Sequence, residues 1–538
     1  MVKTTKKRKR AETTTSDLFL VSGTNHASEA TSIDDCLQEL EAFASASRPQ
    51  ATLQPFPGIE TSDSVQGLAV QVPHEYRNEL QRRVQEWNSS LGLFVKKGDY
   101  TPGLLPSFEV ELARHFQIKE LSKFILQTGV KIPSFERWLL DSKIEEMLSR
   151  VTPADPVLTG NVSEEHSASK RLVRELVEHL KENDNDAENA ALNIVKELCR
   201  RTQRTAIPEI QSQARRCAHQ TPLKNEKITI EFDQKDDRSC VALQFSRKKW
   251  KKPFLIKLNK SHYEKLEHRF IRVHALDTSS KLEWTRSTGV DRKEKQAFHL
   301  IVMTMVLRYS SLSGGQLLDD LRGGGMEGAV HSEVFQVLGD FFSSSPVHEC
   351  FASPLNAYSP CFNSAFSEDL DWHFGSVGNF FANVVPVEGC LEANPPFSPG
   401  LMNAMVDNIE HSIHDADQNN KCLTYAIIVP TFDTSASAPQ AKTFAKASFM
   451  RMVRGKCCRL HIVLSARSHG YIEGAQHLRP TQFKDSTYDT SVIVLQSQLA
   501  RKQDLDEKHF EKAVRIAFAS RHKQEIARRS QLPLASHN

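Results

Sequence analysis

Four consecutive residues, Asn394, Pro395, Pro396 and Phe397, have the types needed to methylate an aromatic amine. The exocyclic amine of adenine is a poor nucleophile because its lone pair is delocalised into the ring. The Asn394 side-chain carbonyl and the Pro395 backbone carbonyl can each accept one amine hydrogen and so orient the nitrogen. Fixed carbonyl dipoles stabilise the positive charge that develops, and Phe397 offers a face on which an extruded base stacks. The tetrapeptide therefore predicts methylation of adenine N6 by S-adenosylmethionine.

The flanking sequence places this tetrapeptide between a strand and a helix. The stretch from Glu392 to Phe397 follows a candidate strand, and a helix is predicted after it over Leu401–Ser412. Two prolines cannot donate to a sheet, so the strand must end there. Residues 347–500 alternate short strands and helices, which is typical of an α/β sheet. Ligands bind such sheets in the crevice beyond the strand ends.

Other segments show clear periodicity. Apolar residues at helical spacing predict helices over 108–128, 134–150, 167–181, 186–202, 298–309 and 505–529. The face of Phe135, Trp138 and Leu139 is expected to be core rather than a platform for a base. Alternating apolar residues predict strands near 228–232, 241–245 and 254–258. We therefore divide the chain into four parts. Residues 1–70 form a disordered basic and polar tail, and residues 71–290 form a helical accessory domain with a small β portion that binds RNA or cap. Residues 291–500 form a methyltransferase domain, and residues 501–538 form a basic C-terminal helix.

Two basic clusters suggest contacts with partners. Arg247, Lys248, Lys249, Trp250, Lys251 and Lys252 place an aromatic ring within a run of cations. Such a cluster can follow RNA phosphates while the ring stacks on a base, or it can be a solubilising hairpin tip, and both readings stay open. The run Lys6–Arg10 on a polar tail indicates nuclear import.

Composition excludes several other functions. The 538 residues are 39% hydrophobic and 25% charged, with a formal net charge of +3, so RNA binding must depend on where the charge lies. No apolar run is long enough for a membrane span. The 10 cysteines form no CxxC pair and the 21 histidines no HExxH motif, so we expect free thiols and no metal site. The glycine run Gly323–Gly325 lacks the spacing of a phosphate-binding loop.

Several short strings, in order, resemble the phosphorylated CTD-interacting factor family, the cap-specific adenosine N6-methyltransferases. The resemblance covers about residues 298–497, and similarity at Lys257–Leu266 extends it toward the accessory region. The matching strings are Leu307-Arg308-Tyr309, Glu349 to Asn356, Phe374-Gly375-Ser376, Glu392 to Phe397, Ile428-Val429-Pro430, Gly474 with Gln476-His477, and Val492 to Gln496.

The resemblance implies a Rossmann-like class I methyltransferase core beside an N-terminal, mainly helical domain. The substrate would be 2′-O-methyladenosine next to the 7-methylguanosine cap of mRNA. The cofactor S-adenosylmethionine would be held by Phe351, Ala352, Ser353, Pro354, Asn356, Phe374, Gly375, Ser376 and Glu392. Ser353 and Asn356 could hydrogen-bond its amino acid moiety, and Phe374 could cover its adenine.

This sequence departs from the family in three places. Animal members carry a WW module that binds the phosphorylated tail of RNA polymerase II, and the five tryptophans here do not form its spaced pair. The resemblance allows the tail as a partner, but the missing pair argues against it. Phe432 stands at a family Trp position, and Ile472 stands where a basic residue is expected. Methylation of adenine in internal RNA or DNA, and an inactive RNA-binding relative, remain as alternatives.

Overall fold

The computed structural model describes most of the chain from Ser107 onward. The described residues are 107–149, 153–180, 186–218, 226–233, 240–247, 253–273, 293–315, 328–344, 347–360, 362–367, 369–382, 385–432, 444–473 and 483–531. The predictions for residues 1–70, including the Lys6–Arg10 run, and for Gly323–Gly325 lie outside them.

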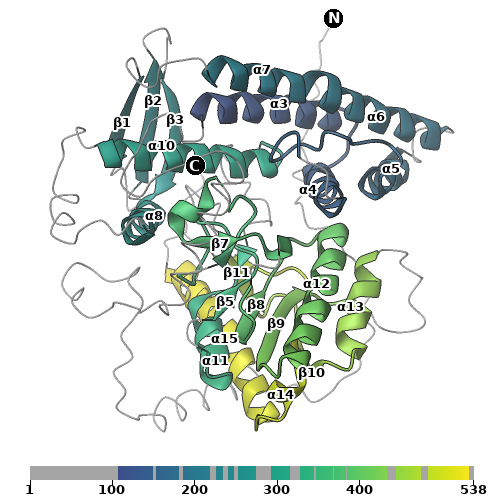
Figure 1. The fold of residues 1–538 in the computed structure, drawn as a ribbon, viewed down its shortest axis with the longest axis vertical. Coiled ribbons are helices and arrows are strands. Elements are labelled where there is room, and N and C mark those ends of the chain that lie inside the picture. The colour runs from purple at the N-terminus through teal and green to yellow at the C-terminus, as the bar shows by residue number, and fades with distance from the viewer. Residues whose placement is uncertain are drawn as a thin grey trace, which may run out of the picture.

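Helices between residues 108 and 312 form one layer (Figure 1). They are α3 (Phe108–Leu126), α4 (Ile132–Leu148), α5 (Ser167–Leu180), α6 (Ala187–Arg201), α7 (Ile207–Ala218) and α10 (Lys293–Leu312). The four helices predicted between residues 108 and 202 are confirmed to within a few residues at each end. Helices α5, α6 and α7 are amphipathic and each buries one apolar stripe, whereas α10 is buried on all sides from Phe298 to Leu312.

The aromatic face of α4 lies in the core of this layer. Phe135, Trp138 and Leu139 are each at most 2% exposed, and the Trp138 Nε1–H donates to the Ser169 hydroxyl over 3.1 Å. A buried indole needs such an acceptor. The prediction that this face is core is confirmed.

A single π-helical turn, Thr202–Ala206, joins α6 to α7. Thr202 and Ala206 are buried, and the Thr202 hydroxyl donates to the Leu198 carbonyl over 2.9 Å. The extra residue of the π turn keeps the buried faces of both helices on the same side.

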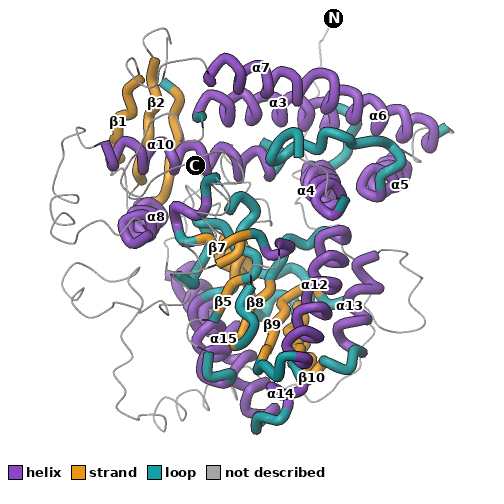
Figure 2. Tube along the Cα trace, viewed as in Figure 1, coloured by secondary structure: helices purple, strands orange, loops and turns teal. Residues whose placement is uncertain are grey.

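A small antiparallel sheet lies beside this layer, as Figure 2 shows. Its order is β1 (Glu226–Asp233), β2 (Cys240–Arg247) and β3 (Phe254–Asn259), with α8 (Lys260–Val273) following. Val241, Leu243 and Phe245 are fully buried, which confirms the alternation predicted for β2. Helix α8 was not predicted.

The second half of the chain forms a seven-stranded sheet. Five strands are parallel in the order β7-β6-β5-β8-β9, and β13 and then β10 extend the β9 edge with antiparallel pairing. In chain order they are β5 (His348–Glu349), β6 (Phe362–Asn363), β7 (Ser376–Gly378), β8 (Gly389–Ala393), β9 (Leu423–Pro430), β10 (Cys458–Leu464) and β13 (Thr490–Gln496). A mixed α/β fold with a parallel sheet is therefore confirmed.

Helices cover both faces of this sheet. Tyr425 and Ile427 of β9 pack with α12 (Pro399–Gln418) and α13 (Phe444–Arg454), whereas Ala426 and Ile428 pack with α11 (Ser332–Phe341) and α15 (Glu507–Gln531). Successive strand residues point to opposite faces, so a strand between two helical layers must be apolar throughout. The short helices η3 (Asp371–Phe374), η4 (Phe380–Ala382) and α14 (Gln498–Arg501) complete this unit.

A second small sheet brings a distant segment to the main sheet. Its order is β12 (Phe483–Asp485), β11 (Gly470–Glu473) and β4 (Gly328–Ala329). The antiparallel register places Gly328 opposite Glu473.

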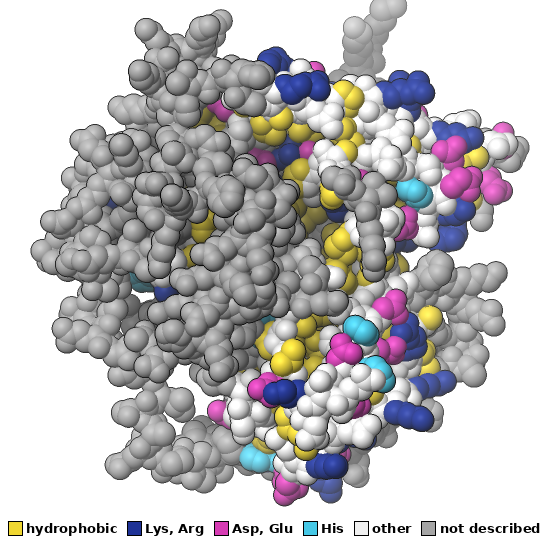
Figure 3. All heavy atoms as spheres, in the orientation of Figure 1, with side chains coloured by type: hydrophobic (Ala, Val, Ile, Leu, Met, Phe, Trp, Pro, Cys, Tyr) yellow, Lys and Arg dark blue, Asp and Glu magenta, His cyan; other side chains and the backbone are white. Residues whose placement is uncertain are grey.

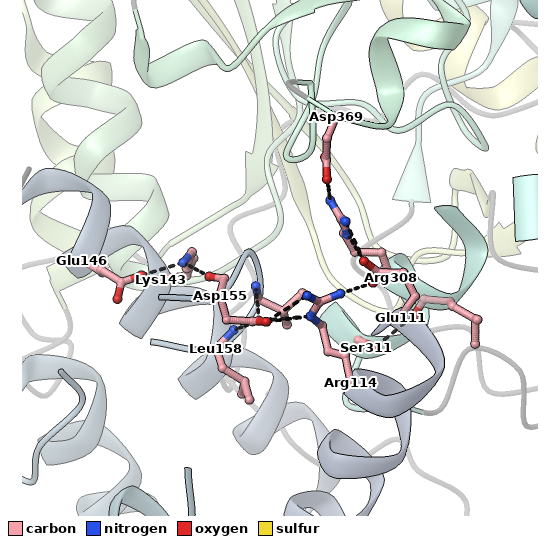
Figure 4. A network of polar contacts seen from close by, with 11 residues as sticks. Glu111, Arg114, Lys143, Glu146, Asp155, Leu158, Arg308, Ser311 and Asp369 are labelled. Atoms are coloured by element: carbon pink, nitrogen blue, oxygen red, sulfur yellow. Dashed lines mark hydrogen bonds and ion pairs between the residues drawn. The ribbon is translucent and has the colours of Figure 1, made fainter. Parts of the chain in front are cut away.

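A buried ionic network ties the helical layer to the sheet unit (Figure 4). Arg308 of α10 bonds Glu111 of α3 at 2.6 Å and Asp369 of the sheet unit at 2.6 Å. Arg114 pairs with Glu111 and bonds Asp155 at 2.9 Å. Burial alone would raise the pKa of Glu111, but the two guanidinium groups hold it below its usual value.

Candidate active site

Strands β5 and β8 are neighbours whose carboxyl ends lie side by side. Glu349 pairs with Glu392 in parallel register, and the Cys350 amide donates to the Glu392 carbonyl over 2.8 Å. From β5 the chain moves outward to β6 and β7, and it returns to the other side of β5 as β8. This reversal is the switch point at which open α/β sheets bind ligands. The segments Phe351–Asn356 and Asn394–Phe397 begin there.

The side chain of Asn394 is buried, and only one end of its amide is bonded. Asn394 is 7% exposed, and its Nδ2 donates to the Gly328 carbonyl of β4 over 2.9 Å. That bond fixes the orientation of the amide. Its Oδ1 is buried and has no hydrogen-bond partner among the described residues. An unsatisfied buried acceptor costs about 1–3 kcal/mol, so it calls for a functional explanation.

The rest of the tetrapeptide forms a stiff turn into α12. Pro395 is buried, and the Pro396 carbonyl accepts the Ser398 amide over 2.8 Å. Phe397 is half-buried and meets Tyr488 edge to face, with ring centroids 5.7 Å apart and an interplanar angle of 87°. The perpendicular tyrosine holds the phenyl ring in one orientation.

Sequence reasoning missed the partners Gly328 and Tyr488. Gly328 arrives through the β4–β11 pairing, and Tyr488 lies in the segment before β13. No local pattern links either residue to position 394. Only the long-range strand pairing brings them together.

The predicted cofactor loop is a tight turn after β5. The Ser353 amide donates to Asn356 Oδ1 over 2.7 Å, and the Ala357 amide returns to the Ser353 carbonyl over 2.9 Å. Ala352 continues the pairing toward β6 through the Asn363 carbonyl, and Pro354 is buried. Ser353 and Asn356 thus bond each other and set the shape of the loop. The half-buried Phe351 ring packs on Phe380 with centroids 4.7 Å apart.

The Phe374-Gly375-Ser376 string is positioned mainly by packing. Phe374 is fully buried near Phe270, with ring centroids 6.3 Å apart. Its ring is part of the core, and its predicted contact with the adenine of the cofactor stays a prediction. Gly375 has φ of 103°, and a Cβ there would lie 2.5 Å from the Pro360 carbonyl oxygen, so only glycine fits. The Ser376 hydroxyl contacts the Ser364 hydroxyl at 2.7 Å.

Two buried carboxyl groups face one another at the switch point. Burial raises the pKa of Glu349 to about 7, although the amides of Ser359 and Tyr358 and the charge of Arg269 oppose the rise. Burial and the neighbouring Glu349 raise the pKa of Glu392 well above its usual value. Within the described residues, no hydrogen bond or ion pair reaches the Glu392 carboxyl group. A cationic ligand would satisfy it.

The predicted RNA-binding cluster falls almost wholly outside the described residues. Arg247 ends β2, and Lys248, Lys249, Trp250, Lys251 and Lys252 belong to the link toward β3. Figure 3 shows other Lys and Arg side chains along the upper edge of the molecule, where Figure 1 places α6 and α7. The last turns of these helices hold Arg200, Arg201, Arg215 and Arg216.

The described part of the chain contains no group of three or more His, Cys, Asp or Glu residues that could hold a metal ion. None of its helices is long and apolar enough to cross a membrane. The seven cysteines whose side chains the structure describes are free thiols, in agreement with the prediction.

Comparison with known proteins supports the resemblance read from the sequence. A family model described as the phosphorylated CTD interacting factor 1 WW domain matches residues 281–474. Two similar proteins are each named mRNA (2′-O-methyladenosine-N(6)-)-methyltransferase. The one from Homo sapiens is 30% identical and the one from Mus musculus 31%, each over 214 residues, which is 39% of this chain. The match covers only 28% of either relative's own length. The predicted resemblance to this family is confirmed.

Proposed function

We propose that this chain transfers a methyl group from S-adenosylmethionine to N6 of 2′-O-methyladenosine next to the 7-methylguanosine cap of mRNA. The observation that carries the proposal is the buried, unpartnered Oδ1 of Asn394 at the switch point of the sheet. An N6 amine hydrogen would supply the missing donor. The names of the two similar proteins support the substrate.

The sheet unit is proposed to be a Rossmann-like class I methyltransferase core. The order β7-β6-β5-β8-β9, with antiparallel β13 inserted before β10, supports this assignment. The helical layer with its small sheet would be the accessory domain that holds RNA and cap.

The turn residues would orient the amine and stabilise the developing charge. When bound, S-adenosylmethionine supplies a methyl group on a sulfonium sulfur, and that bond breaks as the N6 lone pair takes the methyl. Asn394 Oδ1 and the Pro395 carbonyl accept the two N6 hydrogens and aim the lone pair. Their dipoles stabilise the charge on nitrogen until one N6 proton leaves to water. Phe397, steadied by Tyr488, stacks against the extruded base.

The residues at the end of β5 and β8 fit a cationic cofactor. Glu392 would bind a positively charged group, since its buried carboxyl group has no cation partner among the described residues. The loop of Phe351, Ala352, Ser353, Pro354 and Asn356 would line the same crevice. Gly375 and Ser376 would shape its floor at the start of β7.

The remaining assignments are proposals about partners and location. Arg247–Lys252 would contact RNA phosphates, and Lys6–Arg10 would direct the chain to the nucleus. Capped mRNA is the proposed substrate partner. The description of the matching family model also makes the phosphorylated polymerase tail a partner to test.

One experiment separates this function from its alternatives. RNAs that begin with 2′-O-methyladenosine, capped or uncapped, and a capped RNA that begins with 2′-O-methylguanosine would be incubated with protein and donor. Their nucleosides would then be analysed by mass spectrometry. The proposal expects N6-methylated 2′-O-methyladenosine only from the capped A-starting RNA. Methylation of internal adenines would favour the alternative of an adenine methyltransferase that acts on internal RNA or DNA. Donor binding without any product would favour an inactive RNA-binding relative.

A further inference from the structure

Helix α12 follows the reactive turn, and its N-terminus is capped by a carboxylate from the helical layer. Asp141 of α4 is 2% exposed, and its Oδ1 accepts the Ser398 hydroxyl. The same oxygen accepts the amides of Gly400 over 3.1 Å and Leu401 over 3.3 Å. These amides belong to the first turn of α12, where a helix lacks internal acceptors.

Asp141 therefore replaces the cap that the helix would ordinarily supply itself. Ser398 is the N-cap residue, but its side chain makes no cap bond within its own helix and donates to Asp141 instead. A carboxylate at this position also suits the positive end of the helix dipole. The cap is supplied from a position 259 residues away from Gly400 in the chain.

The carboxylate is itself held in place. Its Oδ2 bonds Arg171 of α5, and Arg171 contacts Glu175, which in turn bonds Arg137 over 2.9 Å. Gly400 shows how closely the two elements approach, because a Cβ there would lie 2.7 Å from Asp141 Oδ1. Leu401 and Ala404 of α12 also pack in the same apolar core as α4.

We infer that Asp141 is a positioning residue for the reactive turn. Asn394 is fixed at one end of the turn by Gly328, and Ser398 is fixed at the other end by Asp141. The helical layer thus sets the position of Pro395, Pro396 and Phe397 without touching the reacting atoms. The kinetic consequence of this inference rests on the proposed methyl transfer, whereas its structural consequence does not.

The first test measures amide hydrogen exchange in peptides covering residues 394–404 of the full chain. Asp141→Ala should speed exchange at Gly400 and Leu401 at least about 10-fold, because their acceptor is lost. Asp141→Asn keeps an acceptor oxygen and should restore most of the protection. The matched control is Asp407→Ala, because Asp407 is an exposed carboxylate on the same helix that pairs with Arg451. Unchanged exchange in Asp141→Ala would overturn the inference, whether or not the protein is a methyltransferase.

The second test separates kcat from donor binding. We expect Asp141→Ala to lower kcat about 10- to 100-fold, since small misplacements of reacting groups cost that much. The affinity for S-adenosylmethionine should stay within about twofold, because its proposed ligands follow β5 and β8 rather than α4. Near-normal kcat in an active preparation would contradict the positioning role. An inactive wild-type protein would refute only the proposed function. If Asp141→Ala does not fold, Ser398→Ala removes one of the three bonds and takes its place in both tests.

A double-mutant cycle gives an independent check on the contact. Gly400→Ala should lower kcat in the wild-type background, because the new methyl group collides with Asp141. In the Asp141→Ala background the carboxylate atoms are gone and only the Cβ of residue 141 remains, at 3.3 Å, so the same change should have a clearly smaller effect. Equal effects in both backgrounds would show that the Asp141 contact does not position the turn.

Discussion

At the scale of single residues, the two ends of the Asn394 side-chain amide have different roles: the nitrogen is structural, and the oxygen is available for the proposed chemistry. The nitrogen is bonded to Gly328, and the oxygen awaits a donor. We expect Asn394→Ala to lower kcat about 100-fold or more while the protein stays folded, because an orienting dipole is lost. Single-turnover kinetics and circular dichroism would measure the two effects. Asn419→Ala, on the exposed end of α12, is the control. Near-normal turnover in Asn394→Ala would place the reactive site elsewhere.

Glu392 gives a prediction about pH. A carboxyl group with a raised pKa keeps its proton over a wider pH range in the free protein, and binding of a cation to the carboxylate must release that proton. The affinity for S-adenosylmethionine should therefore rise with pH until the pH passes the raised pKa of Glu392 in the free protein, by at most about tenfold per pH unit. In Glu392→Gln the affinity should be weaker, and its dependence on pH should be smaller. Titration calorimetry in buffers of different ionisation enthalpy would count the released proton.

Burial also raises the pKa of the neighbouring Glu349, to about 7. Glu349→Gln is therefore needed beside Glu392→Gln to divide the pH dependence between the two groups. Exposed Glu410→Gln is the control. A wild-type affinity that does not change with pH would remove Glu392 from the cofactor site.

At the scale of elements, the β2–β3 connection carries the predicted RNA contact. Reversing the charges of Arg247, Lys248, Lys249, Lys251 and Lys252 should weaken RNA binding and flatten its salt dependence, because fewer counterions are released. Binding would be measured at several salt concentrations by fluorescence anisotropy. Reversal of exposed Lys502 and Lys508 is the control. An unchanged salt slope would favour the solubilising hairpin tip.

The sequence predicted single elements well, because their signals are local. The apolar spacing around Phe135 and Trp138 determines both the helix and its buried face. The Pro395-Pro396 pair marks the end of β8 because neither residue can donate to a sheet. Strand β4 has two residues and no alternation, so its pairing with β11 could not be predicted. Asp141 looked like one acidic residue on a helix, and its role depends on a contact across 260 positions. Phe374 was assigned to the cofactor by resemblance, and only its burial revealed a core residue.

At the scale of the whole molecule, the network around Arg308 joins the helical layer to the sheet unit. Arg308→Met would leave the buried Glu111 with one guanidinium partner, Arg114, in place of two, and would remove the bond to Asp369 of the sheet unit. It should lower the free energy of unfolding by about 3–5 kcal/mol. Urea denaturation would measure the loss. Arg451→Met removes a half-exposed Arg from Asp407 and Glu410, and should cost about 0–1 kcal/mol. A loss for Arg308→Met as small as that of the control would show that the network does not hold the two parts together.

The π turn at Thr202–Ala206 has a consequence for how this protein can change in length. Elsewhere in α6 or α7, losing one residue would rotate everything beyond it by about 100° and expose the apolar stripe. Within the π turn, the same deletion converts the wide turn into an ordinary α turn and leaves both stripes in phase. Related chains that differ by a one-residue insertion or deletion in this layer are therefore expected to have it at this turn, because a change of length is tolerated there.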